Sequence, residues 1–94
     1  MTDKQLTEAV AVEIIGLKIK GPYFYLPDPL HDWNHTHQVI DKMRERGWSF
    51  LMEIEEDTTH VKFYRAPYTA KDAFNKDPQR AILECALKAV RSER

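Results

Sequence analysis

The segment from His31 to His37, HDWNHTH, holds three of the four histidines of the chain, with an aspartate and a tryptophan. Imidazoles bind transition metals and change charge near neutral pH, so a metal site or a proton-handling site would be sought here first. The sequence has no glycine-rich phosphate loop, no nucleophile elbow and no His-Glu-x-x-His motif. Whether these histidines can act together depends on the element that holds them.

Helical geometry separates the histidines. At about 100° per residue, His35 and His37 lie about 160° apart on a helix, so they cannot bind one metal ion. His31 and His35 share a face only if the helix begins by Leu30. If Asp32 is the N-cap instead, His31 lies in the turn before the helix. Two imidazoles are fewer ligands than a zinc site needs, and we expect neither a metal nor a cofactor.

Other chemistry-bearing residues give no catalytic arrangement. The acidic run Glu53, Glu55, Glu56 and Asp57 follows a strand into a turn, which is typical of a solvated sheet edge. His60 has no evident base partner. The single cysteine lies in an apolar helical run, so it is expected to be a small buried side chain, and no internal disulfide can form. We expect no catalytic residues and no enzyme activity.

Three helices are expected to position these side chains. The first follows Thr2 or Asp3 as N-cap, buries a stripe of apolar residues and ends near Gly16 in a left-handed cap. The second runs to Arg46 with Gly47 after it, and its buried side is expected to contain Trp33, Thr36, Val39, Ile40 and Met43. The third has Asp77 as its cap and Pro78 in its first position. The stripe of the first helix comprises Leu6, Val10, Ile14 and Leu17.

The strands lie between the second and third helices. Residues 48–55 alternate with period two, placing Trp48, Phe50, Met52 and Ile54 on one face, and residues 60–67 form the return strand of a hairpin. Residues 68–78 fit either a further short strand or a loop. A short β-prone stretch, Tyr23, Phe24 and Tyr25, precedes the second helix.

The element order predicts the class α+β, as α-(β)-α-β-β-α in one domain spanning residues 1–94. A sheet of two or three strands offers little area on one face for three amphipathic helices. We therefore expect a three-layer α/β/α sandwich, with a small, largely antiparallel sheet and helices on both of its faces.

Composition excludes several classes. Fourteen basic residues against fifteen acidic ones give a net charge of −1, whereas nucleic-acid binding usually needs a clear basic excess. No apolar run approaches the ~20 residues of a membrane span, and the first residues lack the pattern of a signal peptide. We expect a soluble protein of the cytoplasm that binds neither nucleic acid nor membrane.

The stretches EAVAVEIIGLKI, LHDWNHTHQVIDKMRERGW and DPQRAILECALKAV, in this order and spacing, cover most of the chain. Together they resemble the opening, second and closing helices of the phage ABA sandwich domain family, which consists of small bacteriophage and prophage proteins. The family usually has a Tyr-Ser-Thr-like lead into the second helix. Here that lead is Pro29-Leu30-His31, which keeps Asp32 but loses the hydroxyl caps. The resemblance implies the three-layer sandwich and a phage-linked origin, and the residues it carries over (Asp32, Trp33 and the closing helix) are structural.

The first functional expectation is a non-enzymatic phage accessory protein in the host cytoplasm that acts by protein contact. Its partner would be a host or phage protein or a second copy in a homodimer, and inhibition of a host defence system belongs to this class. The candidate contact residues are Tyr23, Phe24, Tyr25, Asp32 and Trp33, because clustered aromatic side chains mark interfaces.

Two alternatives remain. In a small-ligand binder, Tyr23, Tyr25, His31, His35 and Arg44 would line a pocket for a nucleotide-like molecule. A metal-dependent hydrolase is the third possibility, and it would need His31 and His35 to share a metal with a further ligand.

Overall fold

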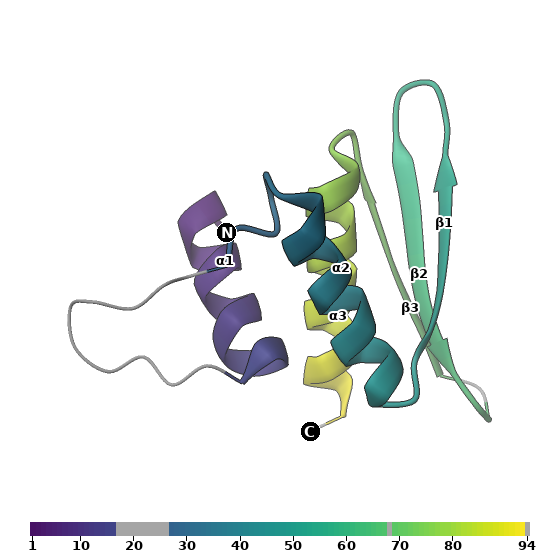
Figure 1. Cartoon of the computed structure of the whole chain (residues 1–94). Coiled ribbons are helices and arrows are strands. Elements are labelled where there is room, and N and C mark those ends of the chain that lie inside the picture. Colours follow the sequence, from purple (N-terminus) through teal and green to yellow (C-terminus); the bar gives the residue numbers. More distant parts are fainter. Residues whose placement is uncertain (17–26, 68, 94) are drawn as a thin grey trace.

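The structure is a computed structural model, and it describes residues 1–16, 27–67 and 69–93. The described helices are α1 (Asp3–Val10), its π-helical continuation η1 (Ala11–Ile15), α2 (Trp33–Glu45) and α3 (Pro78–Ser92), and the strands are β1 (Ser49–Ile54), β2 (Thr59–Arg65) and β3 (Thr69–Asn75). The predicted α+β class is confirmed (Figure 1). The β-prone stretch over residues 23–25 lies outside the described residues, as does Leu17 of the first stripe.

The three strands form one antiparallel sheet in the order β1-β2-β3. The predicted hairpin is confirmed, with Phe50 opposite Phe63 and Met52 opposite Val61. The segment that fitted either a strand or a loop is the strand β3, in which Ala73 pairs with Val61. Because side chains alternate along a strand, these residues share the face that meets the helices.

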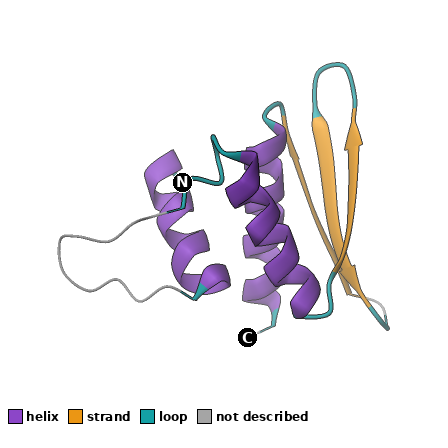
Figure 2. Ribbon diagram, viewed as in Figure 1, coloured by secondary structure: helices purple, strands orange, loops and turns teal. Residues whose placement is uncertain are grey.

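All the described helices lie on one side of this sheet (Figure 2). In these residues α2 and α3 cover the sheet, and α1 with η1 packs against α3 and α2 (Figure 1). The expected sandwich with helices on both faces is therefore not confirmed, and the layers here are α1, then α2 with α3, then the sheet. We had expected a small sheet to offer too little area on one face for three helices. That expectation required every helix to pack on the sheet, whereas α1 buries its apolar stripe against other helices.

The other face of the sheet explains in part why no described helix covers it. Its nine positions alternate with the buried ones, and they include four ionisable side chains: Glu53, His60, Lys62 and Asp72. A helix over this face would remove water from these side chains, which is unfavourable unless each one gains a hydrogen-bond or ion-pair partner. Tyr64 and Phe74 on the same face remain 44% and 61% exposed.

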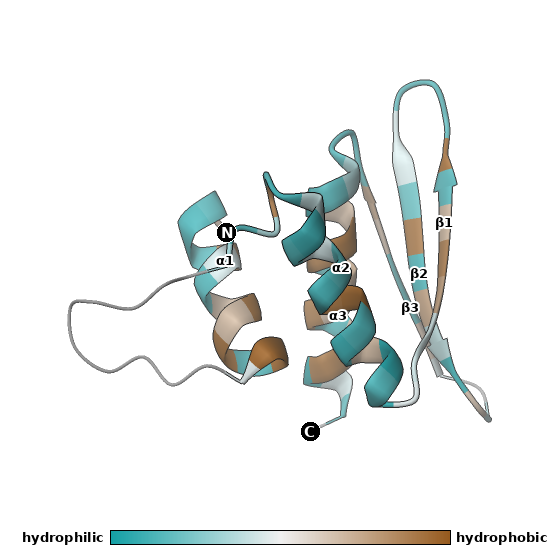
Figure 3. Ribbon diagram, viewed as in Figure 1, coloured by the Kyte–Doolittle hydropathy of each residue, from teal (hydrophilic) through white to brown (hydrophobic). Residues whose placement is uncertain are grey.

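Helix α3 occupies the centre of the core. Its buried positions lie between α1 and the sheet, where Figure 3 shows hydrophobic residues along the helix. They are Ala81, Ile82, Leu83, Cys85, Ala86, Leu87, Ala89 and Val90. Small residues at four of these positions let the helix approach its neighbours closely on several sides.

The helix ends follow the sequence signals. The Thr2 hydroxyl accepts a hydrogen bond from the backbone N–H of Gln5, whose side chain accepts one from the Thr2 N–H, so the two form a capping box. Gly16 ends the helix at φ +85°, a left-handed conformation that favours glycine. The Asp77 carboxylate accepts from the N–H of Gln79, and Pro78 follows it as predicted.

Candidate functional site

Helix α2 begins at Trp33, not at Leu30. Asp32 is its N-cap, and the Asp32 carboxylate accepts a hydrogen bond of 2.9 Å from the Asn34 N–H. The backbone N–H of Asp32 donates to the Asp28 carbonyl at 2.8 Å, which closes the preceding turn. His31 therefore lies in that turn, as in the second of the two predicted starts.

Asp28 links the two histidines that share this end of the helix. Its carboxylate lies 2.9 Å from Nδ1 of His31, and its backbone N–H donates to Nδ1 of His35 at 2.7 Å. Because Nδ1 of His35 accepts this hydrogen bond, the neutral imidazole carries its proton on Nε2. This arrangement orients the turn on the helix. No group of three or more metal-binding side chains gathers anywhere in the described residues.

The structure separates the residues predicted to form a ligand pocket. Tyr23, Phe24 and Tyr25 lie outside the described residues. His31 and His35 meet at Asp28, whereas Arg44 lies nine residues further along α2, about 13 Å from His35 along the helix axis. The pocket proposed from the sequence therefore does not bring Arg44 to these histidines.

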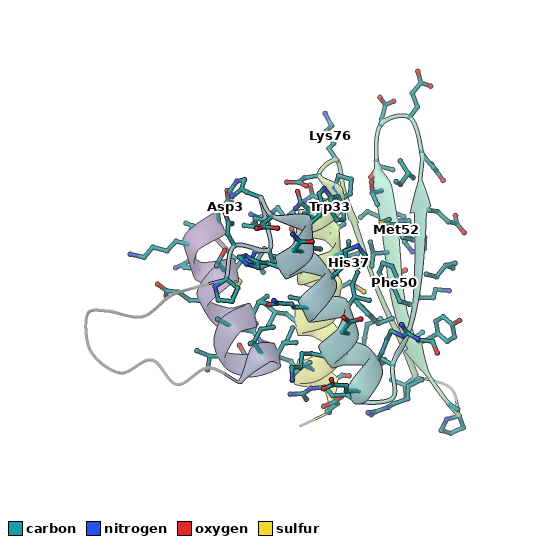
Figure 4. The ribbon with its side chains drawn as sticks, in the orientation of Figure 1. Asp3, Trp33, His37, Phe50, Met52 and Lys76 are labelled. Atoms are coloured by element: carbon teal, nitrogen blue, oxygen red, sulfur yellow. The ribbon has the colours of Figure 1, made fainter. Side chains whose placement is uncertain are left out.

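Arg44 instead borders an open groove between α2 and the start of β1, which we call the α2–β1 groove. It has a volume of about 660 Å³. Figure 4 shows His37 on α2 and Phe50 on β1, which face this space from its two sides. The groove is lined by His37, Ile40, Asp41, Arg44, Gly47, Trp48, Ser49 and Phe50.

Charges of both signs border an apolar floor in this groove. His37, Asp41 and Arg44 are exposed side chains at successive turns of α2, whereas Phe50 is half-buried. His37 lies next to the buried stripe in the helical projection, so its place beside the sheet could have been anticipated. Nothing in the local sequence indicates that β1 lies next to this side of α2, because that contact depends on the packing of the whole sheet.

Trp33 extends the apolar border of the groove by one turn. It was expected to be buried, and this expectation is wrong, because Trp33 is 46% exposed. Leu30 and the buried Thr36 close the core at this end of the helix, and the Thr36 hydroxyl donates to the Pro29 carbonyl at 2.6 Å. The indole is left on the same side of α2 as His37, one turn away.

The inner end of the groove is fixed by a cluster around Glu93. Its carboxylate accepts hydrogen bonds from Trp48 Nε1 at 2.6 Å and from the guanidinium of Arg46 at 2.9 Å. Arg65 donates to it at 3.2 Å and places its guanidinium 4.5 Å from the Trp48 ring centroid. Burial alone would raise the pKa of Glu93, but hydrogen bonds from Trp48 and Arg46 and the charges of both arginines outweigh it and lower that pKa.

His60 finds a partner on the outer face of the sheet. Its Nε2 lies 3.2 Å from the carboxylate of Asp72, and its ring stacks on Phe74 with centroids 4.1 Å apart. The sequence did not reveal this pair, because Asp72 belongs to the segment that fitted either a strand or a loop. Both neighbours of His60 come from β3.

Comparison of the chain with models of known protein families, with curated proteins and with solved structures found no match. Among the described helices, none has the length and apolar character that crossing a bilayer requires. The α2–β1 groove and its surroundings are therefore the features of this chain from which a function is inferred.

Proposed function

We propose that this chain is a small non-enzymatic accessory protein of a bacteriophage or prophage, and that it acts by binding another protein chain at the α2–β1 groove. The observation that carries the proposal is a groove between a helix and a strand, with an apolar floor and with exposed apolar and charged side chains at its border. Such a combination is typical of protein interfaces, in which aromatic residues and arginine supply much of the binding energy.

The apolar border supports contact with a protein. Trp33 is 46% exposed and Ile54 is 68% exposed, and Phe50 and Met52 are half-buried on the helix-facing side of β1. Figure 4 labels three of these side chains, Trp33, Phe50 and Met52, with His37 among them. Burying a large apolar side chain stabilises a complex by roughly 1.5–3 kcal/mol. Asp32, also a candidate contact residue, has its carboxylate engaged as the cap of α2.

The phage origin rests on the resemblance of the three helical stretches to the phage ABA sandwich domain family. Under this proposal the protein works in the host cytoplasm, and inhibition of a host defence system is one form that the contact could take. The family's sandwich with helices on both faces belongs to the same proposal.

An affinity experiment tests the contact function. Tagged protein is incubated with bacterial lysate, in parallel with the double variant Trp33→Ala/Arg44→Glu and the control Phe74→Ala. Phe74 is a matched control, because it is an exposed aromatic residue on the opposite face of the sheet. We expect a stoichiometric partner with the wild type and Phe74→Ala and none with the double variant. A strictly monomeric protein that retains nothing would contradict the proposal.

The groove also favours a second candidate function, the binding of a small nucleotide-like anion. Arg44 supplies a cationic donor and His37 an imidazole ring beside Phe50, and rings next to a cation suit a base attached to a phosphate. A thermal-shift screen over linear and cyclic nucleotides tests this, with Arg44→Ala as the variant that should lose any response. No shift of the wild type with any nucleotide would contradict it.

A further inference from the structure

Strand β1, which borders the groove, is an edge strand of the sheet with a sequence that is unusual for an edge. In the part of the chain that the structure describes, β1 pairs with β2 alone, so its other side carries backbone groups without a strand partner. Edge strands normally contain lysine, proline or a bulge that prevents pairing with other chains. The sequence of β1, SFLMEI, has one charged residue and neither lysine nor proline. This edge is therefore open to a further strand.

The opposite edge of the sheet is protected. Strand β3 carries Lys71 and Asp72, and α3 packs along it. Lys88 of α3 donates a hydrogen bond of 3.0 Å to the Asp72 carbonyl, and the Cys85 thiol donates one of 3.0 Å to the Lys71 carbonyl. Of the two sheet edges, only that of β1 lacks such side-chain partners among the described residues.

We propose that β1 pairs antiparallel with β1 of a second copy of this chain, to give a six-stranded sheet across a twofold axis. The inference rests on the proposed function and names its partner. An antiparallel pair of identical strands requires an axis perpendicular to the sheet, so the helices of both copies lie on the same side. Directly opposed residues then point to the same face, and the axis passes beside one residue of β1.

Two registers meet this condition and also bring the apolar, helix-facing residues of the two β1 strands into contact. With the axis beside Met52, Phe50 lies opposite Ile54 of the second copy. With the axis beside Leu51, Phe50 lies opposite Met52. In both registers the helix-facing row of Phe50, Met52 and Ile54 continues into the same row of the second copy. The 68% exposed Ile54 is then covered by apolar neighbours.

The residues of β1 fit a second copy of the same strand. In either register its one charged residue, Glu53, lies opposite Leu51 or Ser49 of the second copy, so no like charges meet across the junction. The net charge of −1 adds little repulsion between two copies. The same axis places the two α2 helices antiparallel to one another, on the same side of the extended sheet.

Sedimentation velocity tests the dimer. The wild type should sediment with a mass near twice 11.1 kDa, and Met52→Lys should sediment as a monomer, because it places a lysine at the proposed junction. The control Phe74→Lys, on the outer face of β3, should remain a dimer. If Met52→Lys does not fold by circular dichroism, Ile54→Lys replaces it, since that side chain is mostly exposed and folding should tolerate the change.

Cysteine cross-linking tests the register. In a Cys85→Ala background, single cysteines replace Phe50, Leu51, Met52 and Glu53 in turn. The residue beside the axis faces its own copy at a Cα separation of roughly 4.5–5.5 Å, which a disulfide can span. Either Leu51→Cys or Met52→Cys should therefore oxidise to a covalent dimer much faster than the other three variants. Equal rates at all four positions would overturn the strand pairing.

The outcomes separate this inference from the proposed function. A wild type that is monomeric at all concentrations, or a dimer unaffected by both Met52→Lys and Ile54→Lys, overturns the β1 pairing. If that monomer still captures a bacterial protein, and the capture is lost in Trp33→Ala/Arg44→Glu, the contact function stands without the dimer. A monomer that captures nothing overturns both.

Discussion

At the scale of single residues, Glu93 joins three parts of the chain that are distant in sequence. It accepts from Arg46 and Trp48 in the turn between α2 and β1, and from Arg65 at the end of β2. Its side chain is 21% exposed, so these hydrogen bonds are partly shielded from water. Charge-assisted bonds of this kind are stronger than those between neutral groups.

Replacing Glu93 by glutamine is therefore expected to reduce the free energy of unfolding by about 1–3 kcal/mol, because the amide nitrogen would face a guanidinium donor. Urea denaturation measures the change. Glu56→Gln is the control, since Glu56 is exposed at the hairpin turn and should change stability by less than about 0.5 kcal/mol. Equal effects of the two substitutions would show that the cluster contributes nothing beyond surface charge.

The lowered pKa of Glu93 also gives this cluster a pH dependence. The stabilisation is fully present above the ordinary carboxyl pKa of 4.5 and is lost as the pH falls through the lower pKa of the folded state. The difference in unfolding free energy between wild type and Glu93→Gln should therefore narrow below about pH 4.5. Denaturation series at several acidic pH values test this sign, and a difference that widens on acidification would contradict it.

Cys85 gives a prediction at alkaline pH. Burial raises the pKa of its thiol from the ordinary 9.0 to about 11. From pH 9 upward the thiol loses its proton in the unfolded chain before it does so in the folded protein. The free energy of unfolding should therefore fall by about 2–3 kcal/mol by pH 11. The measured quantity is the difference in unfolding free energy between wild type and Cys85→Ala, in which lysine and tyrosine titrations cancel. A constant difference over this range would contradict a buried thiol.

At the scale of elements, the start of α2 separates structural roles within the histidine segment. The Asp32 carboxylate caps the helix, whereas His31 is a largely exposed partner of Asp28. Asp32→Ala should therefore cost about 1 kcal/mol of stability, and His31→Ala less than about 0.5 kcal/mol. Thermal unfolding of both variants measures this. A larger loss in His31→Ala would assign His31 a role that its exposed contact does not provide.

Most elements could be predicted from sequence because their signals are local. The caps at Thr2 and Asp77, the left-handed Gly16 and the alternation in β1 and β2 each depend on neighbouring residues. The strand β3 could not be assigned from its own residues, TAKDAFN, which have weak β propensity. Pairing with β2 supplies its hydrogen bonds and its register.

The candidate site was less predictable, because it is assembled from two elements. Helical projection predicted that His35 and His37 lie about 160° apart on the helix, and it placed His37 at the margin of the buried stripe. It could not show that Phe50 faces His37. It also placed Trp33 in the core, since a projection treats all turns alike and ignores how the preceding turn fills the end of the helix.

At the scale of the whole molecule, the layers differ in how they are secured. Helix α3 contacts both the sheet and the other helices. Helix α1 lies at one side of the molecule, and its packing contacts are with helices. Two ion pairs support α1 and η1, Arg80 with Asp3 and Arg91 with Glu13. Each pair has one partner that is largely exposed to solvent, so the pairs contribute modestly, and the attachment of this layer depends mainly on its apolar stripe.

Native-state hydrogen exchange should therefore show that α1 opens at a lower free energy than α3 and β2. The backbone amides of Val10 and Ile14 report on the outer layer, and those of Leu83 and Val61 report on the core. NMR-detected exchange at low denaturant concentration resolves the two groups. Equal opening free energies would show that the layers unfold as one unit.

The contacts between α1 and α3 join residues almost 80 positions apart, as Asp3 and Arg80 illustrate with a separation of 77. The hairpin, β3 and α3 are neighbours in sequence, so they can assemble after closing only short loops. We therefore expect the sheet and α3 to form first and α1 to dock last. Val10→Ala should in consequence speed unfolding while leaving the folding rate nearly unchanged.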